Sequence, residues 1–469
     1  MSAPQRSAAA PDLGRPVAVV GVGVMGEAVA RALLRRGHRL ILLDDRPGPR
    51  HAALTAELGV GVQTAPPAGD DAAWAAALDG AGAFLPTPGL PERHPAFAAA
   101  AAAGLATISE FDLAARWDDR PIAAITGTNG KTTVTMMVTA MLERTGRHAA
   151  AVGNTDVPLV AALDDAAVEV FVVEASSFRL GHSRRFAPRV GTWLNFAPDH
   201  LDVHRDLATY EASKARIWRD QGPDDLAVGN LDDPVVARHL ATAPGRRIGF
   251  TIGPDGADGS GPHARTPRYG VAGGWLHDEA GRRLLEVGSM PRALPHDVAN
   301  ALAAIATATA AGASSDAAVE VVRTWEQLAH RVQLVAAAAG LRFYDDSKAT
   351  TPHATLAALS GFERVVLIAG GQNKGIDLTP LADGASHLRA VIAIGAAADE
   401  VAAAFGERVP VVSVRTNMDD AVAAAAAQAQ PGDAVLLSPA CASFDWYRNY
   451  GERGDDFARA ARAWVGDQR

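Results

Sequence analysis

Apolar runs and amphipathic stretches alternate along most of the chain. In PVAVVGVGVMGEAVARALLRRGHRLILLDD, residues 16–45, an apolar run leads to a glycine turn, then to an amphipathic stretch that stops at Gly37, and then to a second apolar run that ends in two acids. Short continuous apolar runs favour buried strands, and the amphipathic stretch favours a helix that covers them. The segment therefore predicts the first strand, helix and second strand of a Rossmann-like unit.

The glycine turn of this unit has the spacing G-x-G-x-x-G. Gly21, Gly23 and Gly26 form the motif, and an acid follows about 20 residues later at the end of the next strand. In a dinucleotide site such glycines let the backbone approach a pyrophosphate at a helix amino terminus. From these residues alone, a nicotinamide cofactor, another phosphate-bearing nucleotide and simple tight packing of the turn all remain open.

A second strand, loop and helix begin at residue 121. PIAAIT predicts a short buried strand, TTVTMMVTAMLERTG predicts a helix with one apolar face, and TGTNGK lies between them. The loop differs from G-x-x-x-x-G-K-[ST], because Ile125 stands where the first glycine would fall and the glycine is Gly127. Backbone N–H groups and the helix dipole would still favour anions there, with Lys131 directed to phosphates and the Thr132 hydroxyl available to Mg²⁺.

Polar residues follow the next two predicted strands, at 168–174 and 190–195. Glu174 ends the first of these strands, and His200 follows the second. Carboxyl ends of parallel strands share one edge of a sheet, so both side chains are expected beside Lys131, where a magnesium ion needs hard ligands. A helix-capping acid and a core histidine are the alternatives. Lys214, one helical turn after Tyr210 in YEASKARIW, also fits an exposed lysine.

A third α/β block follows Leu328, with strands predicted in LRFYDD, RVVLIAGG, RAVIAIG, PVVSV and AVLLSP. Before it, a Gly- and Pro-rich stretch at 243–289 predicts a hairpin. Lys348 and Lys374 lie in polar clusters at strand ends, a composition suited to a carboxylate or a transferring phosphoryl group, although either lysine alone also fits a solvated surface. The predicted fold is α/β with three domains: Rossmann-like at 1–109, a P-loop ATPase-like parallel sheet at 110–327, and Rossmann-like α/β at 328–469.

Composition narrows the classes of function. The 469 residues are 48% hydrophobic and 21% charged, with a formal net charge of −9, so the chain lacks the basic character that nucleic acid requires. The single cysteine, Cys441, excludes an internal disulfide and suits a reducing compartment. No apolar segment reaches the roughly 18 residues of a membrane span. We expect a cytoplasmic monomer that binds small molecules.

Ten ordered segments resemble the Mur ligase family over almost the whole chain. They are TGTNGKTT, GNTDVPL, EASSFRL, NFAPDHLDVH, YEASKARIW, PHDVANALAA, HRVQ, YDDSKATTPHATLAAL, AGGQNKG and SPACASFDWYRNYGERGDDF. DDSKATTP and SPACASFD resemble the branch that adds glutamate to UDP-N-acetylmuramoyl-L-alanine. The resemblance implies an ATP- and Mg²⁺-dependent amide ligase of peptidoglycan synthesis, working through an acyl phosphate.

The resemblance also implies a role for particular residues. ATP contacts are implied for Gly127, Thr128, Asn129, Gly130, Lys131, Thr132, Thr133, Asn300, Arg331 and Asp346. Magnesium ligation is implied for Thr132, Glu174, His200 and a carbamylated Lys214. Catalytic roles are implied for Lys131, Glu174, His200, Lys214 and Lys348, and closure of the third domain for His330 with Arg331.

Substrate contacts follow from the same resemblance. UDP is expected at Met25, Asp44, Arg46, Pro88 and Gly89, so the first glycine turn would hold uridine and pyrophosphate rather than NAD. Further contacts to the uridylylated substrate are expected at Asn154 and Ser176, and the glutamate pocket at Thr350, Lys374, Ser443 and Tyr450.

The chain departs from the family pattern at four positions: Asp156 replaces a usual glycine, Arg179 a glutamine, Asp297 an asparagine and Tyr450 a phenylalanine. Arg179 offers a charge for the sugar or diphosphate. Three alternatives remain: a ligase of the same mechanism that takes L-glutamate, another muropeptide or a folate-type acceptor; an NAD-dependent oxidoreductase built on the first glycine turn; and a non-catalytic nucleotide-binding regulator.

Overall fold

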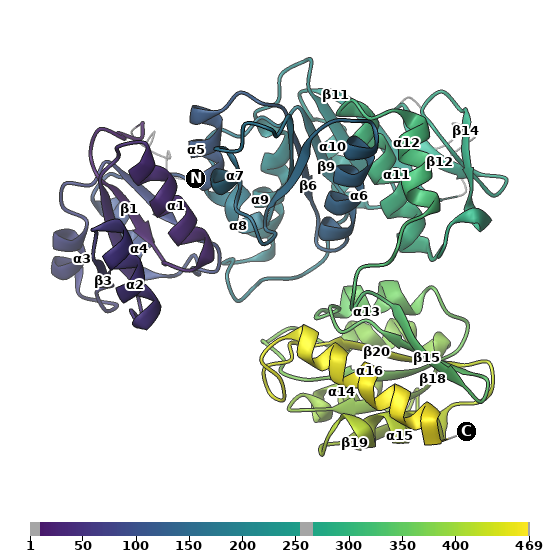
Figure 1. The fold of residues 1–469 in the computed structure, drawn as a ribbon. Helices are drawn as coiled ribbons and strands as arrows, with labels where there is room; N and C mark the ends of the chain where they lie inside the picture. Colours follow the sequence, from purple (N-terminus) through teal and green to yellow (C-terminus); the bar gives the residue numbers. More distant parts are fainter. Residues whose placement is uncertain (1–9, 254–265, 468–469) are drawn as a thin grey trace, which may run out of the picture. The chain divides into compact units, whose positions relative to one another are not determined.

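The computed structural model describes residues 10–253 and 266–467, whose strands form three sheets (Figure 1). By its internal contacts the chain divides into two compact units, described separately below. The first unit contains the two amino-terminal sheets, and the second contains the carboxy-terminal sheet.

The amino-terminal sheet has five parallel strands in the order β3-β2-β1-β4-β5. Its elements are β1 (Val17–Val20), α1 (Val24–Arg35), β2 (Leu40–Asp44), α2 (Pro49–Leu58), β3 (Val62–Thr64), α3 (Asp71–Ala77), β4 (Ala83–Pro86), α4 (Pro95–Ala102), β5 (Ala106–Thr107) and α5 (Glu110–Trp117). Val17 and Val19 pack in one apolar cluster, while Ala18 and Val20 pack in another on the opposite face. Both faces of β1 are therefore buried, which explains its uninterrupted apolar sequence.

The central sheet has the order β14-β13-β12-β11-β10-β9-β6-β8-β7 among the described residues. Its elements are β6 (Ile122–Thr126), α6 (Lys131–Arg144), β7 (Ala149–Gly153), α7 (Leu159–Ala162), β8 (Val170–Glu174), α8 (Ser177–His182), β9 (Val190–Trp193), α9 (Leu207–Arg219), β10 (Leu226–Asn230), α10 (Pro234–Leu240), β11 (Arg246–Thr251), β12 (Arg268–Ala272), β13 (Trp275–His277), β14 (Arg283–Glu286), α11 (Pro295–Ala310) and α12 (Ser315–Arg323). The predicted hairpin corresponds to the antiparallel strands β12, β13 and β14, which extend this sheet.

Register in the central sheet brings the predicted polar residues to one edge. β6 lies between β8 and β9, parallel to both, with Ile125 opposite Glu174 and Thr126 opposite Trp193. The loop that follows β6, the end of β8 and the residues after β9 therefore meet at the carboxyl edge of the sheet. Strand order in a parallel sheet, and not only the local motif, thus positions the site.

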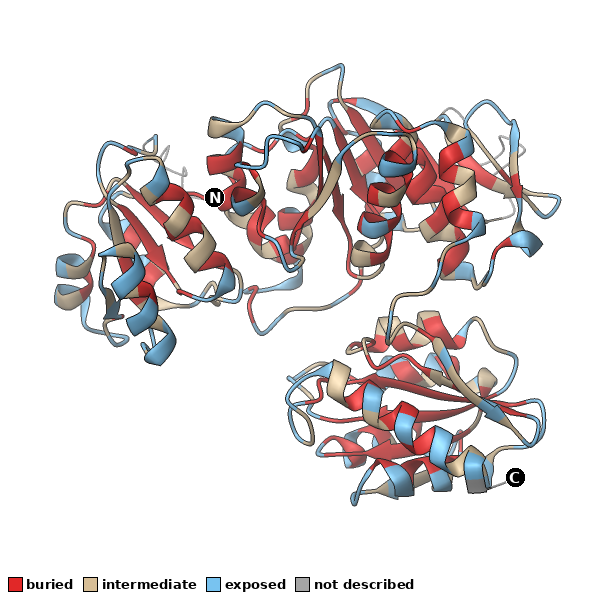
Figure 2. Cartoon of the chain, viewed as in Figure 1, coloured by how far each residue is buried: buried red, intermediate tan, exposed pale blue. Residues whose placement is uncertain are grey.

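The carboxy-terminal sheet has the order β15-β16-β20-β17-β18-β19, with β15 antiparallel at one edge. Its elements are β15 (Gln333–Ala338), β16 (Leu341–Asp345), α13 (Pro352–Leu359), β17 (Val365–Gly370), η3 (Thr379–His387), β18 (Leu388–Ile394), α14 (Ala398–Phe405), β19 (Val411–Val414), α15 (Met418–Gln428), β20 (Ala434–Ala440) and α16 (Tyr450–Asp467). Along β17, Val365 and Leu367 pack with α13 and α14, whereas Val366 and Ile368 pack with α15 and α16. Helices thus cover both faces, and β17 and β20 are buried along their whole length (Figure 2).

Candidate functional site

The loop between β6 and α6 has the backbone of a phosphate-binding turn. Gly127 and Gly130 have φ of 157° and 81°, values that only glycine adopts readily, and Lys131 begins α6. The Nζ atom of Lys131 donates hydrogen bonds to the carbonyls of Gly127 and Thr128, both at 2.9 Å. The lysine therefore lies folded against its own loop.

A residue that the sequence motifs did not single out fixes the shape of this loop. Asn195, just after β9, accepts hydrogen bonds at its Oδ1 atom from the backbone N–H groups of Thr128 (3.0 Å) and Asn129 (2.8 Å), and its Nδ2 atom donates to the Asn129 carbonyl at 3.2 Å. The signal that could have found it is its place at a strand end beside the loop.

Helix α9 brings Lys214 to the same loop. Its side chain is 1% exposed, and its Nζ atom donates to the Gly127 carbonyl at 2.7 Å while lying 4.6 Å from the centre of the Tyr210 ring. The Tyr210 hydroxyl in turn lies 3.2 Å from Thr128 Oγ1. Lys214 is thus not the exposed lysine that its sequence context also allowed. Two ammonium groups, from Lys131 and Lys214, meet at one carbonyl oxygen.

His200 lies close to both lysines. Burial, together with the positive charges of Lys131 and Lys214, lowers its pKa to about 3. The imidazole is therefore neutral near pH 7, the form that binds metals. The ring also contacts Phe178 edge-on, with centroids 4.9 Å apart.

Glu174 presents one oxygen that is free to bind a cation. Its Oε1 atom accepts a hydrogen bond from Asn154 Nδ2 at 3.1 Å, whereas its buried Oε2 atom has no hydrogen-bond partner. Among the described residues, no group of three His, Cys, Asp or Glu side chains surrounds a common point. A carboxylate oxygen, a neutral imidazole and a hydroxyl nevertheless fit magnesium, which prefers few protein ligands together with phosphate oxygens.

Arg179 reaches Asn154 from inside the protein. Its Nη1 atom donates to Asn154 Oδ1 at 2.9 Å, and its Nε atom lies 2.5 Å from Oε1 of Glu110, a fully buried residue at the start of α5. Burial raises the pKa of Glu110, and the positive charge of Arg179 opposes that rise. Arg179 thus pairs with a buried acid, and it orients the Asn154 amide so that its N–H₂ faces Glu174.

Four further residues of this unit were expected at the site: Asn300, Ser176, Thr132 and Thr133. The Oδ1 atom of Asn300 lies 2.6 Å from the position that a Cβ on Gly130 would take, so only glycine admits the asparagine there. Ser176 caps α8 by accepting from the Arg179 N–H at 3.4 Å. Thr132 and Thr133 occupy the first turn of α6, where Thr133 is buried and Thr132 half-buried.

The first glycine turn is held by an acid instead of being surrounded by cations. The Oδ2 atom of Asp44 accepts from the Val22 N–H at 2.7 Å, and its Oδ1 atom accepts from the Arg46 N–H at 2.9 Å. Met25, expected at the UDP, is 7% exposed and packs in the core of this domain. Gly89 is exposed with φ of 93°.

In the second unit, polar residues gather at the ends of β16 and β20. His330 Nδ1 lies 2.6 Å from Asp345 Oδ2, and this hydrogen bond raises the pKa of the histidine. Burial raises the pKa of Asp346 to about 7, although Ser438 Oγ donates to it at 2.7 Å and the nearby Arg331 charge opposes the rise. Asp346 also accepts from the Val332 N–H at 3.2 Å.

Both lysines of this unit lie over aromatic rings. Lys348 Nζ is 3.8 Å from the centre of the Tyr450 ring, and Lys374 Nζ is 5.0 Å from that of Phe444, which is 58% exposed. Ser443 is buried, and its carbonyl accepts from the N–H groups of Trp446 at 3.2 Å and Tyr447 at 2.9 Å. Thr350 is half-buried.

Sequence reasoning also missed Arg453, a buried arginine on α16. It donates to the Ser347 hydroxyl and carbonyl, both at 2.9 Å, and to the carbonyls of Cys441 and Ala442. It thereby ties the loop after β16 to the loop after β20. The run NYGERGDD in which it lies gives no sign that this arginine is internal.

The chain is similar to known proteins along nearly its whole length. The profile of the Mur ligase middle domain matches residues 125–308, that of the Mur ligase glutamate ligase domain matches residues 330–441, and that of an F420-dependent NADP oxidoreductase matches residues 16–74. The UDP-N-acetylmuramoylalanine–D-glutamate ligase of Frankia casuarinae is 44% identical, covering 97% of this chain and 95% of its own. The enzyme of the same name from Thermobifida fusca is 38% identical, covering 97% and 99%.

Solved structures with low sequence identity share the fold. The pseudomurein peptide ligase type C of Methanothermus fervidus is 17% identical with a TM-score of 0.59, covering 97% of this chain and 100% of its own. The MurF ligase of Thermotoga maritima, solved in complex with ADP, is 14% identical with a TM-score of 0.58, covering 97% and 95%. In the described residues no helix is long and apolar enough to cross a membrane. From its fold and from full-length identities well above 30%, the chain belongs to the Mur ligase family.

Proposed function

We propose that this protein is an ATP-dependent ligase that joins D-glutamate to UDP-N-acetylmuramoyl-L-alanine during peptidoglycan synthesis in the cytoplasm. The full-length similarity to ligases of that name supports the choice of substrates. The observation that carries the chemistry is the meeting of Lys131 and Lys214 at the Gly127 carbonyl, beside the glycine loop. The Lys131 ammonium would place positive charge where a triphosphate binds, while Lys214 holds its amine at the same carbonyl, where a carbamate would make it a ligand for the cation.

The loop is built to receive phosphates. Gly127 to Thr133 would supply backbone N–H groups at the amino terminus of α6, and Lys131 would exchange its bonds to the loop carbonyls for bonds to the β and γ phosphates. Asn195 already holds the Thr128 and Asn129 backbone in place, so the loop needs little reorganisation on binding. Asn300, against Gly130, is proposed to face the adenine side.

Magnesium is proposed to lie between Glu174, His200, Thr132 and the phosphates. The unpaired Oε2 atom of Glu174 and the neutral ring of His200 support this set. When bound, the cation would neutralise part of the charge on the transferring phosphoryl oxygens. Asn154, which Arg179 holds in place, donates to Oε1 of Glu174 and thereby leaves Oε2 for the cation.

The reaction follows from the chemistry of a carboxylate, which is a poor electrophile near neutral pH. A carboxylate oxygen of the alanyl group attacks the γ-phosphorus, the bond to the bridging oxygen breaks, and ADP leaves. The glutamate amine then attacks the carbonyl carbon of the acyl phosphate, loses a proton, and expels inorganic phosphate. Lys131 and Lys348 would offset negative charge on the transferring oxygens, and water must be excluded because it would hydrolyse the acyl phosphate.

Each substrate is proposed to bind mainly to one of the three domains. Residues 1–109 would bind UDP around Asp44, Arg46, Pro88 and Gly89. Residues 110–327 would bind ATP and contact the sugar-linked acid through Asn154 and Ser176. Residues 328–469 would bind glutamate with Thr350, Lys374, Ser443 and Tyr450, where Lys374 and Phe444 already form an exposed cation and ring pair.

The test is an ADP-release assay on the purified full-length chain. ADP must appear only when UDP-N-acetylmuramoyl-L-alanine and D-glutamate are both present, and replacement by L-glutamate must reduce the rate to background. Equal rates with both enantiomers would favour the L-glutamate alternative. Activity without either acceptor, or none with both, would contradict the proposal. Because an oxidoreductase profile matches residues 16–74, NADH binding is measured as well. NADH binding without ATP turnover would favour the NAD-dependent oxidoreductase.

A carbamate on Lys214 stays a separate prediction. The Nζ atom is buried and pointed at the loop, so a negative carbamate there would face the proposed cation. Carbon-13 NMR of protein equilibrated with ¹³C-bicarbonate should show one carbamate resonance that disappears in Lys214→Arg. No such resonance in active protein would exclude the modification.

A further inference from the structure

A basic cavity lies on the side of α9 that faces away from the phosphate loop. It has a volume of about 880 Å³ and is bordered by the end of α8, one face of α9, and Arg93, Phe97 and Thr107 of the amino-terminal domain. On α9, Thr209, Ala212, Ser213, Arg216 and Arg219 line it. These residues recur every three or four positions, so they share one helix face. Tyr210, Lys214, Ile217 and Trp218 lie buried on the other face.

Arginine dominates the lining of this cavity. Arg93, Arg184, Arg205, Arg216 and Arg219 border it, and Glu92 is the one carboxylate among the described residues that do so. Glu92 already accepts hydrogen bonds from its neighbours: its Oε1 atom lies 2.8 Å from His204 Nδ1, and its Oε2 atom accepts from the Arg205 N–H at 3.1 Å. The carboxylate also attracts Arg216 electrostatically, so it offsets part of the positive charge of the lining.

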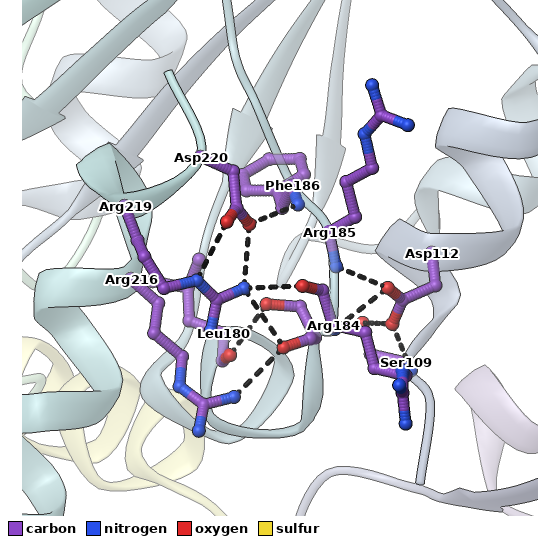
Figure 3. Close-up of polar contacts among 10 residues, drawn as sticks. Ser109, Asp112, Leu180, Arg184, Arg185, Phe186, Arg216, Arg219 and Asp220 are labelled. Carbon is purple, nitrogen blue, oxygen red and sulfur yellow. Dashed lines mark hydrogen bonds and ion pairs between the residues drawn. The ribbon is translucent and has the colours of Figure 1, made fainter. Parts of the chain in front are cut away.

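The acids closest to the arginines hold the backbone turn at 183–186 (Figure 3). Asp112 accepts from the N–H groups of Arg184 and Arg185, at 2.8 and 2.7 Å. Asp220 accepts from the Phe186 N–H at 2.9 Å and forms an ion pair with Arg219 at 2.6 Å. Neither acid lines the cavity. Carboxylates thus hold the turn through its backbone N–H groups, while Arg216 and Arg219 donate to its carbonyls.

Arg216 is the most buried of the arginines that line this cavity. In the part of the chain that the structure describes, no carboxylate lies within ion-pair distance of it, and its Nη1 atom donates to the Ser183 carbonyl at 2.9 Å (Figure 3). Burial and the neighbouring Arg219 charge lower its pKa. A half-buried guanidinium beside a second one is costly unless an anion arrives.

The cavity also contains an apolar surface suited to more than a bare ion. The rings of Phe97 and His182 pack against each other with centroids 5.2 Å apart, and both border the cavity. Burial lowers the pKa of His182 to about 4, so this ring is neutral near pH 7. Cations on one side and neutral rings on another fit a small organic phosphate, and the volume admits a ligand of nucleotide size.

We infer that this cavity is a second anion site, distinct from the ATP loop, that binds a soluble small molecule carrying two or more phosphate groups through Arg216, Arg93 and the neighbouring arginines. Guanidinium groups recognise phosphate oxygens by paired hydrogen bonds, which a planar fork supplies and a single lysine does not. A cavity of this volume, lined from several elements, favours a soluble ligand over a flat lipid surface. The site does not depend on the proposed ligase activity.

The test uses inorganic pyrophosphate as the probe and the full-length chain carrying Lys131→Ala, which disables the phosphate loop. Calorimetric titration should still detect binding in this background. Adding Arg216→Gln should weaken it by about tenfold or more, as expected for loss of a charge-assisted contact. Arg93→Gln, an exposed residue whose loss cannot damage the core, should weaken it as well. Arg246→Gln, an exposed arginine on β11 outside the cavity, is the matched control and should leave the affinity unchanged.

Other outcomes would overturn the inference. Pyrophosphate binding that vanishes with Lys131→Ala alone would assign all affinity to the loop, and binding that is equal in all variants would assign it elsewhere. Vesicles of phosphatidylglycerol provide one more arm: sedimentation with vesicles that depends on Arg216, without pyrophosphate binding, would replace the soluble ligand by a lipid headgroup.

Discussion

The chain contains two glycine turns of similar construction with opposite electrostatics. The turn after β1, with Gly21, Gly23 and Gly26, receives the carboxylate of Asp44 on its backbone. The turn after β6, with Gly127 and Gly130, receives two lysine ammonium groups on its carbonyls. Both connect a buried parallel strand to a helix. Glycine spacing therefore creates a place for the backbone to approach a ligand, whereas the charges that surround the turn select which ligand can bind.

The distribution of lysine sharpens this comparison. Lysine and arginine together number 44, yet lysine occurs only at Lys131, Lys214, Lys348 and Lys374. Arginine serves for almost every other basic position, including all ion pairs of the described surface that do not involve histidine. At Lys131 and Lys214, a compact ammonium fits against the loop carbonyl where a planar arginine fork would not. The first glycine turn has no such residue within its own segment, 16–45.

Removing the central cation should have the largest effect. Lys131→Ala is expected to lower kcat by about 10³-fold, because it deletes the charge that stabilises the transferring phosphoryl group. Lys131→Arg should fail nearly as badly, since the planar fork cannot occupy the place of Nζ between two carbonyls at 2.9 Å. Steady-state ADP release measures both. Arg144→Ala, at the exposed end of the same helix, is the control. Near-normal kcat in Lys131→Arg would show that charge alone suffices.

Filling the first turn should be the next most damaging change, this time to folding. A Cβ on Gly26 would lie 2.2 Å from the Gly21 carbonyl oxygen, so Gly26→Ala should destabilise the protein by about 3 kcal/mol, the upper end of overpacking penalties. Gly23 has open space at the same position, and Gly23→Ala should fold normally. Thermal unfolding compares the pair. If Gly23→Ala raised the KM of the UDP substrate without altering stability, close backbone approach of the ligand would be supported; equal stability of the two variants would refute the packing argument.

Loosening the central loop should have a smaller, selective effect. Asn195→Ala removes two bonds accepted and one donated, so the loop would lose its fixed shape and the KM for ATP should rise by about tenfold, with a smaller fall in kcat. The KM for the UDP substrate should not change. Asn417→Ala, at the cap of α15, removes an asparagine of the carboxy-terminal sheet and is the control. A general loss of stability with no change in the ATP KM would reduce Asn195 to a structural residue.

The smallest effect is expected from neutralising the acid of the first turn. Asp44→Asn keeps a hydrogen-bond acceptor for the Val22 N–H but removes the charge. The hydrogen bond that holds the turn should weaken by about 1 kcal/mol, and the KM of the UDP substrate should rise about fivefold. The ATP KM should stay constant. Substrate titrations with each ligand in turn measure the two constants. A matched rise in both would mean that Asp44 supports the whole fold and not one ligand.

Sequence reasoning found those parts of the site in which local order carries the information. Strand, glycine loop, Lys131 and helix lie within a few residues of each other, and Glu174 and His200 follow strands that become neighbours of β6. The α/β class and its buried strands followed from uninterrupted apolar runs. The edge strand β15 was missed because four of its six residues from Gln333 to Ala338 offer little β signal: three are alanines and one is a glutamine.

Contacts between distant positions could not be predicted in this way. Asn195 holds the backbone of a loop 66 residues earlier, and Arg179 pairs with an acid 69 positions before it. Either side chain is ordinary in its own segment and acquires its role only when the sheet assembles. Arg179, considered from the sequence as a charge for the sugar or diphosphate, is instead buried at 5% exposure. The fine assignment of substrate residues stays a prediction for the same reason.

Helix α9 has consequences for how this chain can change in length. It presents Lys214 on one side and Arg216 on nearly the opposite side, and each residue added or lost before Leu207 would turn the helix by about 100°. A single deletion in the segment that leads into it would move the lysine away from the loop and direct an apolar residue toward the cavity. The rotation of α9 about its axis thus sets both the loop side and the cavity side at once. Substitutions before Leu207 leave this rotation unchanged, whereas insertions and deletions alter it.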